Sequence, residues 1–170
     1  MLNFQPEHFR TKEVLFQEGA KQLSTLGFHI TETDSQRPWG GYIRIAEDDA
    51  AEFIQNFFES NVESQNLPQT PKLLFVAPHQ RLSWQYHKLR QELWRILAGP
   101  VKVITSKSDI PESENIYNAG DIIHLNVEER HRMVGLENWG IWVEIWQHLY
   151  PDHPSTEHDD IYRIADDYGR

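Results

Sequence analysis

The sequence contains no cysteine, so it can form neither disulfides nor a thiolate metal site, and any bound metal must use histidine, carboxylate or amide ligands. It also lacks any run of the roughly 20 apolar residues that a membrane-spanning helix needs. Its first residues show no apolar segment behind a basic start, the pattern of a signal peptide. We therefore expect a cytoplasmic protein with no membrane partner.

Basic residues are scarce as well. Lys and Arg number 16 against 26 Asp and Glu, which gives a formal net charge of −10. Nucleic acid is a poor partner for such a chain, because a phosphate backbone is bound by clustered Lys and Arg. An anionic small molecule remains compatible, because a local pair of cationic side chains can hold one phosphate.

The chain has enough apolar residues for one core. Its 170 residues fit a single domain, and 39% of them are apolar. Apolar residues at helical spacing predict a helix over about residues 6–26, with Gly27 as its stop, and a second helix over residues 47–60.

From residue 72 onwards, short apolar segments alternate with turns, which is typical of a β-sandwich or barrel. A short strand at 42–45 precedes this region, and the C-terminal segment is expected to form a helical turn or an edge strand. The strands predicted after it cover residues 72–78, 82–89, 92–97, 101–105, 115–125, 131–136 and 141–149.

One predicted strand carries polar side chains towards its own core. Gln85 and His87 are two residues apart and therefore share a face. A tight turn at residues 88–91 would let the next strand bring Glu92 back beside them. An amide oxygen, an imidazole and a carboxylate would then converge at one depth in the sheet.

A fourth ligand must come from elsewhere in the chain, with His131 as the first candidate and His124 as the second. Nitrogen and oxygen ligands of this kind suit Zn²⁺, Mn²⁺, Fe²⁺, Co²⁺ or Ni²⁺. We expect one divalent metal, with zinc as the first choice. The alternative is a hydrogen-bonded network of the same side chains without a metal.

Several segments, taken together in this order and spacing, resemble a known family. They are "RPWGGY" at 37–42, "RLSWQYHKLRQELWRILAG" at 81–99, "HR" at 131–132, "VEIW" at 143–146 and "DDIYRIADDYGR" at 159–170. The family is the cupin domain of type II phosphomannose isomerases, which is also the C-terminal domain of bifunctional mannose-1-phosphate guanylyltransferases. The resemblance implies a mainly β fold, with one jelly-roll barrel over residues 37–170 behind an N-terminal helical extension over residues 1–36.

The resemblance also implies a ligand set and a reaction. Its metal ligands, carried over to this chain, are Gln85, His87, Glu92 and His131. The implied reaction is aldose–ketose isomerisation of a sugar phosphate, and mannose 6-phosphate with fructose 6-phosphate is the first pair to expect. Guanylyl transfer is not expected, because the chain shows no glycine-rich nucleotide loop.

The residue that moves the proton stays open between several candidates, namely Lys72, Glu144, His79 and a hydroxide on the metal. Arginine suits phosphate because its fork of donors can bind two oxygens at once. We expect Arg163 to take part in catalysis, and Arg81, Arg132 and Arg170 to bind phosphate or sugar hydroxyls, although each could instead be a surface salt-bridge partner.

The chain departs from the family pattern at His79, Lys88, Asn126 and His158, which we expect to line the mouth of the pocket and to affect the choice of substrate. Two other functions stay open, because a fold does not fix a reaction. The chain could be a non-catalytic cupin that binds a metal or a sugar, or a metal enzyme of another reaction type. Cupin barrels often pair through an edge strand, so a homodimer is also compatible with the sequence.

Overall fold

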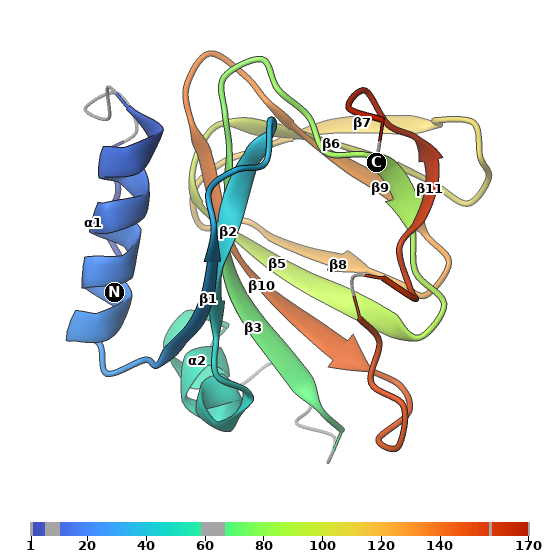
Figure 1. The fold of residues 1–170 in the computed structure, drawn as a ribbon. Coiled ribbons are helices and arrows are strands. Elements are labelled where there is room, and N and C mark those ends of the chain that lie inside the picture. Colours follow the sequence, from blue (N-terminus) through green and yellow to red (C-terminus); the bar gives the residue numbers. More distant parts are fainter. Residues whose placement is uncertain (1, 6–10, 59–66, 157, 170) are drawn as a thin grey trace.

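The computed structural model describes residues 2–5, 11–58, 67–156 and 158–169. Two antiparallel sheets face each other and enclose a barrel (Figure 1). The first sheet has the order β1 (Ile30–Asp34), β2 (Gly40–Ile45), β3 (Gln69–Val76), β10 (Gly140–His148), β5 (Arg90–Ala98) and β8 (Ile122–Leu125). The second has the order β11 (Tyr162–Ala165), β4 (Trp84–Tyr86), β9 (Arg130–Gly135), β6 (Val101–Ser106) and β7 (Ser113–Tyr117).

Two helices precede β3. The first, α1 (Lys12–Thr25), begins where the Thr11 hydroxyl accepts a hydrogen bond from the Val14 amide, and the chain leaves it through Gly27 at φ 93°, the stop that the sequence predicts. The second, α2 (Ala50–Phe57), follows a short 3₁₀ turn, η2 (Glu47–Asp49). The parts of the predicted helices at residues 6–10 and 59–60 lie outside the described residues.

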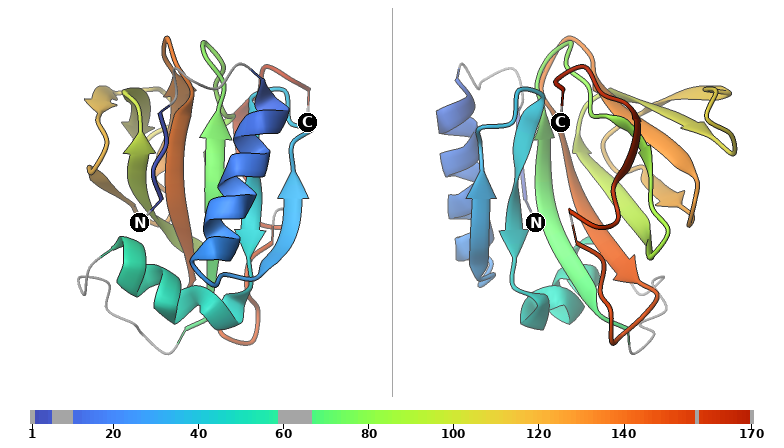
Figure 2. Two further views of the ribbon diagram at one scale, coloured as in Figure 1. Left: turned by 90° about the vertical axis from the view of Figure 1, so that its left-hand side faces the viewer. Right: turned by 45° about the vertical axis from the view of Figure 1, so that its right-hand side comes forward.

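The central strands of the first sheet, β2, β3, β10 and β5, are largely buried on both faces. Figure 2 shows α1 and α2 against its outer face, where the helices and the sheet share one apolar core. A second core fills the barrel between the two sheets. Along β10, Val143 and Ile145 belong to the outer core, whereas Trp142 belongs to the inner one and Glu144 lines a cavity in the barrel. Both faces of β10 therefore need apolar side chains.

The predicted jelly-roll barrel with an N-terminal helix is confirmed, but two local predictions need correction. The single strand predicted over 115–125 is wrong, because β7 and β8 lie in different sheets and the chain turns between them at Gly120, with φ 99°. The structure also has a strand that the sequence analysis did not predict, because β1 pairs with β2 across the turn near residue 36. The N-terminal segment thus adds a strand to the barrel sheet as well as a helix.

The predicted hairpin between residues 82–89 and 92–97 is also wrong. β4 pairs with β9 and β11, whereas β5 pairs with β10 and β8. Residues before and after the turn at 88–89 therefore belong to opposite sheets, and their side chains meet across the barrel interior. The C-terminal segment forms an edge strand, β11, and not a helical turn. In the described part of the chain, no helix has the length and apolar character needed to span a bilayer.

Candidate metal centre and its cavity

Three buried side chains from different strands converge inside the barrel. His87 directly follows β4, Glu92 lies on β5 and His131 lies on β9, and their ligand atoms are all within 4.8 Å of one another. Nε2 of His87 is 3.1 Å from Oε1 of Glu92, and Nε2 of His131 is 3.5 Å from Oε2 of Glu92. The two sheets thus bring together three of the four ligands that the sequence predicts.

Backbone carbonyls fix the proton positions on both imidazoles. Nδ1 of His87 lies 2.6 Å from the carbonyl oxygen of Asp160, and Nδ1 of His131 lies 2.9 Å from that of Glu129. A carbonyl can only accept, so each Nδ1 carries the hydrogen and each Nε2 turns a lone pair towards Glu92. Nε2 of His131 is buried without a hydrogen-bond partner. A divalent cation would satisfy these converging lone pairs, so the residues fit a metal.

The charge states suit the same role. Burial lowers the pKa of His131 to about 4, so this imidazole is neutral at pH 7, as a metal ligand must be. Burial opposes ionisation of Glu92, but nearby positive charge, that of Arg90 included, outweighs it and holds the pKa of this carboxyl well below its usual value. The Trp94 indole and the Arg90 guanidinium each donate to one Glu92 oxygen, at 3.2 Å and 2.9 Å. Glu92 is thus held as an oriented carboxylate.

Arg90 forms one wall of the cluster. It is buried, stacks on the ring of Trp146 at 3.5 Å, and donates to His87 Nε2 at 3.2 Å and to Asp160 Oδ2 at 3.3 Å. With a metal bound, the His87 lone pair would go to the metal, and Arg90 would keep its bonds to Glu92 and Asp160. The sequence segment containing Arg90 is part of the family resemblance, but sequence reasoning assigned the residue no role.

Asp160 anchors the turn between the two sheets. Its buried carboxylate accepts hydrogen bonds from the amides of Lys88 at 2.7 Å and Leu89 at 3.0 Å, while its carbonyl oxygen accepts a hydrogen bond from Nδ1 of His87. One residue of the C-terminal segment therefore holds both the turn after His87 and the His87 ring. This role was missed by sequence reasoning, although Asp160 lies within the C-terminal motif.

Gln85, the fourth predicted ligand, stands beside the cluster. Its Nε2 is 3.4 Å from His87 Nε2, and its Oε1 accepts from the Ser83 hydroxyl at 2.5 Å. A half-turn of the amide would direct the oxygen to the cluster. The second candidate for the ligand from elsewhere in the chain, His124, is exposed on β8 and does not take part.

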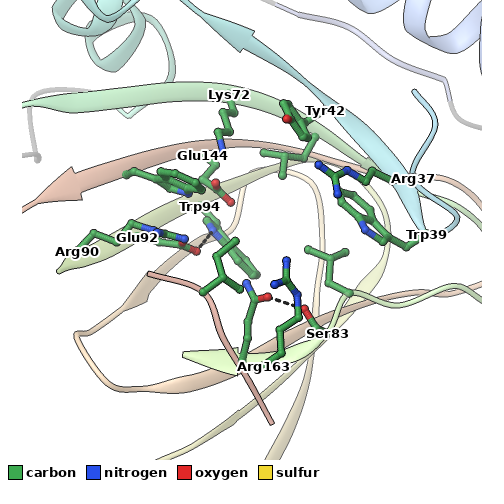
Figure 3. Close-up of a pocket in the computed structure, with 15 residues that line it drawn as sticks. Arg37, Trp39, Tyr42, Lys72, Ser83, Arg90, Glu92, Trp94, Glu144 and Arg163 are labelled. Carbon is green, nitrogen blue, oxygen red and sulfur yellow. Dashed lines mark hydrogen bonds and ion pairs between the residues drawn. The ribbon is translucent and has the colours of Figure 1, made fainter. Parts of the chain in front are cut away.

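A cavity of about 530 Å³, its opening included, adjoins the candidate metal cluster at Glu92 (Figure 3). Gln85 and Glu92 lie in its wall, so a bound molecule could reach the metal site. Of the residues predicted to act in catalysis, all three line it: Lys72, Glu144 and Arg163. Its aromatic lining consists of Trp39, Tyr42, Trp94 and Trp146.

Glu144 and Lys72 face each other across paired strands. They are register partners on β10 and β3, and both are almost fully buried. Burial, together with the charge of Glu92, raises the pKa of Glu144 to about 8, although Lys72 and Arg90 pull it down. The ammonium of Lys72 lies 3.2 Å from the centre of the Trp146 ring. The cavity therefore holds a carboxyl that is mostly protonated at pH 7.

The residues predicted to bind substrate are placed elsewhere. Arg81 forms an ion pair with Asp167 outside the cavity. Arg132 follows His131 on β9, so it points to the other face of the strand, where it donates to the carbonyl of Ala165 at 3.1 Å. Arg170 lies outside the described residues.

The expected pocket mouth is also different. His79 is exposed beside Glu137, at 3.7 Å. Neither this residue nor Lys88, Asn126 or His158 lies in the described lining of the cavity, so the departures from the family pattern do not alter its walls.

No protein-family model matches the chain. The sequence resemblance is confirmed by a curated relative, mannose-1-phosphate guanylyltransferase of Salmonella montevideo, which is 30% identical over 145 residues. The match covers 84% of this chain but only 24% of the relative, so this chain spans about a quarter of that protein's length.

Solved structures share the fold at low sequence identity. Vicilin of hazelnut, Corylus avellana, gives a TM-score of 0.55 at 18% identity, over 74% of this chain and 33% of its own. Oxalate decarboxylase of Lactobacillus farciminis gives a TM-score of 0.53 at 11% identity, and the match covers 82% of this chain and 34% of the decarboxylase. KdgF of a Halomonas species gives a TM-score of 0.52 at 10% identity, and the match covers 72% of this chain and 90% of KdgF. The barrel is thus of the cupin type.

Proposed function

We propose that this cupin-type barrel is a metal-dependent aldose–ketose isomerase that acts on a sugar phosphate, with mannose 6-phosphate and fructose 6-phosphate as the first pair. One observation carries the proposal: a buried acid–base group, Glu144, lines the same cavity as Glu92 of the candidate metal cluster and Gln85 beside it. The similarity to a protein named for mannose 1-phosphate supports a phosphorylated sugar as the ligand.

The reaction moves a proton between C2 and C1 of an open-chain sugar. A divalent metal held by His87, Glu92 and His131, with Gln85 beside them, would supply a Lewis acid that polarises the oxygens on those carbons. Glu144 in its ionised form would accept the proton from C2 and return it to C1. A carboxyl whose pKa is raised towards neutrality by burial suits both halves of that exchange.

Lys72 assists Glu144, because its positive charge favours the ionised carboxyl on the neighbouring strand. The aromatic rings around them would pack against the sugar and exclude water from the transferred proton. Arg163 enters the cavity from β11, so its charge can stabilise the negative oxygen that develops as the proton leaves C2.

The balance of charge in the cavity favours an anionic substrate. Four cationic side chains, Arg37, Lys72, Arg90 and Arg163, share its lining with two carboxyls, of which Glu144 is mostly protonated at pH 7. The whole chain carries a net charge of −10, so this positive cavity contrasts with the rest of the molecule. A phosphate ester suits that local charge.

Proton exchange at C2 tests the proposal. Protein loaded with Zn²⁺, Mn²⁺ or Co²⁺ should introduce deuterium from heavy water into the substrate, which mass spectrometry detects even when net conversion is slow. Glu144→Gln should abolish exchange while metal stays bound, and the matched change at an exposed site, Glu137→Gln, should have no effect. If no sugar phosphate in a broad panel exchanges, the isomerase is excluded and a non-catalytic metal- or sugar-binding cupin replaces it.

A further inference from the structure

One side of the cavity is built by the segment around the turn before β2. Arg37, Trp39 and Tyr42 all line the cavity and come from residues 37–42. In Figure 3 the side chain of Arg37 lies across the cavity from Arg90 and Glu92. The cavity thus has a positive charge at the end away from the metal ligands.

Arg37 is held in place from three directions. Its Nε donates to Oδ2 of Asp34 at 2.6 Å, which fixes the plane of the guanidinium and of its other N–H donors. Its guanidinium carbon also lies 6.0 Å from the centre of the Tyr42 ring. Lys12 on α1 donates to the carbonyls of Ser35 at 2.8 Å and Arg37 at 2.7 Å, so the N-terminal helix supports the loop. An arginine fixed in this way loses little conformational entropy when it binds an anion.

Two of the other three cations in the cavity lining are already engaged deep inside the barrel. Arg90 is buried against Trp146 and holds Glu92 and Asp160, and Lys72 lies over the same ring opposite Glu144. The side chain of Arg37 is 30% exposed, in contrast to the 1% of Arg90. Arg37 therefore lies at a solvent-accessible part of the cavity, where it can meet a charged group of a ligand that enters from solvent.

We infer that Arg37 forms an anion subsite, supported by Lys12 of the N-terminal helix, that binds a phosphate on a carbon remote from the metal ligands. This inference deepens the proposed function and rests on it for the nature of the sugar. An isomerase must place C1 and C2 at the metal ligands, so a phosphate across the cavity belongs to the far end of the sugar, as in a hexose 6-phosphate. Sugar 1-phosphates are selected against because their phosphate would sit at the wrong end.

Binding of an unreactive polyol separates this subsite from catalysis. Calorimetry would compare sorbitol 6-phosphate, sorbitol and inorganic phosphate on the zinc-loaded protein. The wild type should bind the phosphate ester more tightly than sorbitol. Arg37→Gln should weaken ester binding by roughly 10- to 100-fold, because hydrogen bonds between two charged groups are among the stronger ones, and should leave sorbitol binding unchanged.

Two further variants complete the comparison. Arg81→Gln is the matched control, since Arg81 also pairs with an aspartate but lies outside the cavity, and it should bind the ester like the wild type. Arg37→Lys keeps the charge without the fork and should fall between wild type and Arg37→Gln. Lys12→Gln should weaken ester binding by less than Arg37→Gln does, with recovery in Lys12→Arg, if the helix positions the subsite.

The subsite is overturned if the wild type shows no preference for the ester over sorbitol, or if folded Arg37→Gln and Arg37→Lys proteins, checked by thermal melting, both keep that preference. Its failure differs from failure of the isomerase. Loss of ester binding in Arg37→Gln without any C2 exchange would retain the anion subsite and reject the reaction. If instead Arg37→Gln binds the ester like the wild type and C2 exchange is still observed, the isomerase is retained and the anion subsite is rejected.

Discussion

Asp160→Asn should loosen the metal centre without removing a ligand. Oδ1 of Asp160 accepts the amides of Lys88 and Leu89, and Oδ2 faces the Arg90 donor. An asparagine can keep the first oxygen, but its amide nitrogen would then face Arg90, a donor against a donor. The substitution thus removes one charge-assisted bond and weakens two others in a fully buried position.

The magnitude follows from those contacts. Bonds to charged groups contribute about 1.5–3 kcal/mol and neutral ones about 1 kcal/mol, so the three bonds together lose roughly 2–4 kcal/mol of unfolding free energy. The carbonyl of Asp160 also fixes the proton on His87, so a shifted backbone misplaces this ligand. Substitution of groups that orient metal ligands typically weakens metal affinity by roughly 10- to 100-fold.

The neighbouring residue offers a matched control. Asp159 is exposed and only caps the turn at Thr156, at 2.7 Å, so Asp159→Asn should leave both quantities unchanged. Competition titration with Co²⁺ gives the metal affinity, urea unfolding gives the stability, and nitrogen-15 NMR of the metal-free protein reports the His87 tautomer. Equal cobalt affinity and an unchanged tautomer in Asp160→Asn would refute the orienting role of Asp160.

Further outcomes follow from the same cavity. The pKa of Glu144 is raised from 4.5 to about 8, so its contribution to the stability of the metal-free protein is fully present below pH 4.5 and is lost as pH rises through 8. Urea unfolding of the wild type and of Glu144→Gln across that range should show this loss as a difference between the two pH profiles. His87→Ala should abolish metal binding by elemental analysis yet melt cooperatively, because both apolar cores remain, and a non-cooperative melt would contradict this. The exposed His153→Ala is its control and should retain the metal. Metal affinity should fall as pH drops towards 4 and below, because protons then compete with the metal for the imidazole lone pair of His131, whose pKa is about 4.

Much of the barrel and its ligands could be predicted from the sequence. The absence of cysteine restricted the ligand types, and the spacing of Gln85 and His87 placed both on one face of a strand. The same reasoning named Glu92 and, as the first candidate for a further ligand, His131; the family resemblance implied the same set, and the structure brings both residues together with His87. These features are local, because strand alternation and short motifs depend on neighbours in the chain.

The partners of each strand depended on the tertiary structure. The turn after His87 is compatible with a hairpin, but hydrogen bonding to β9 and β10 places β4 and β5 in opposite sheets. The supporting residues Arg90 and Asp160 became visible only when the C-terminal segment closed over that turn. Such pairings join residues some 70 positions apart, as Arg90 and Asp160 show, and no local pattern encodes them.

The direction of Glu144 was decided in the same way. Alternation along β10 predicts that the side chain of Glu144 lies on the opposite face of the strand from those of Val143 and Ile145, but both faces carry apolar residues. The sequence alone therefore determines which side chains share a face, and leaves open which face is the interior. Packing of α1 and α2 on the outer face of the sheet assigns Val143 and Ile145 to the helices and directs Glu144 into the cavity, beside the metal ligands.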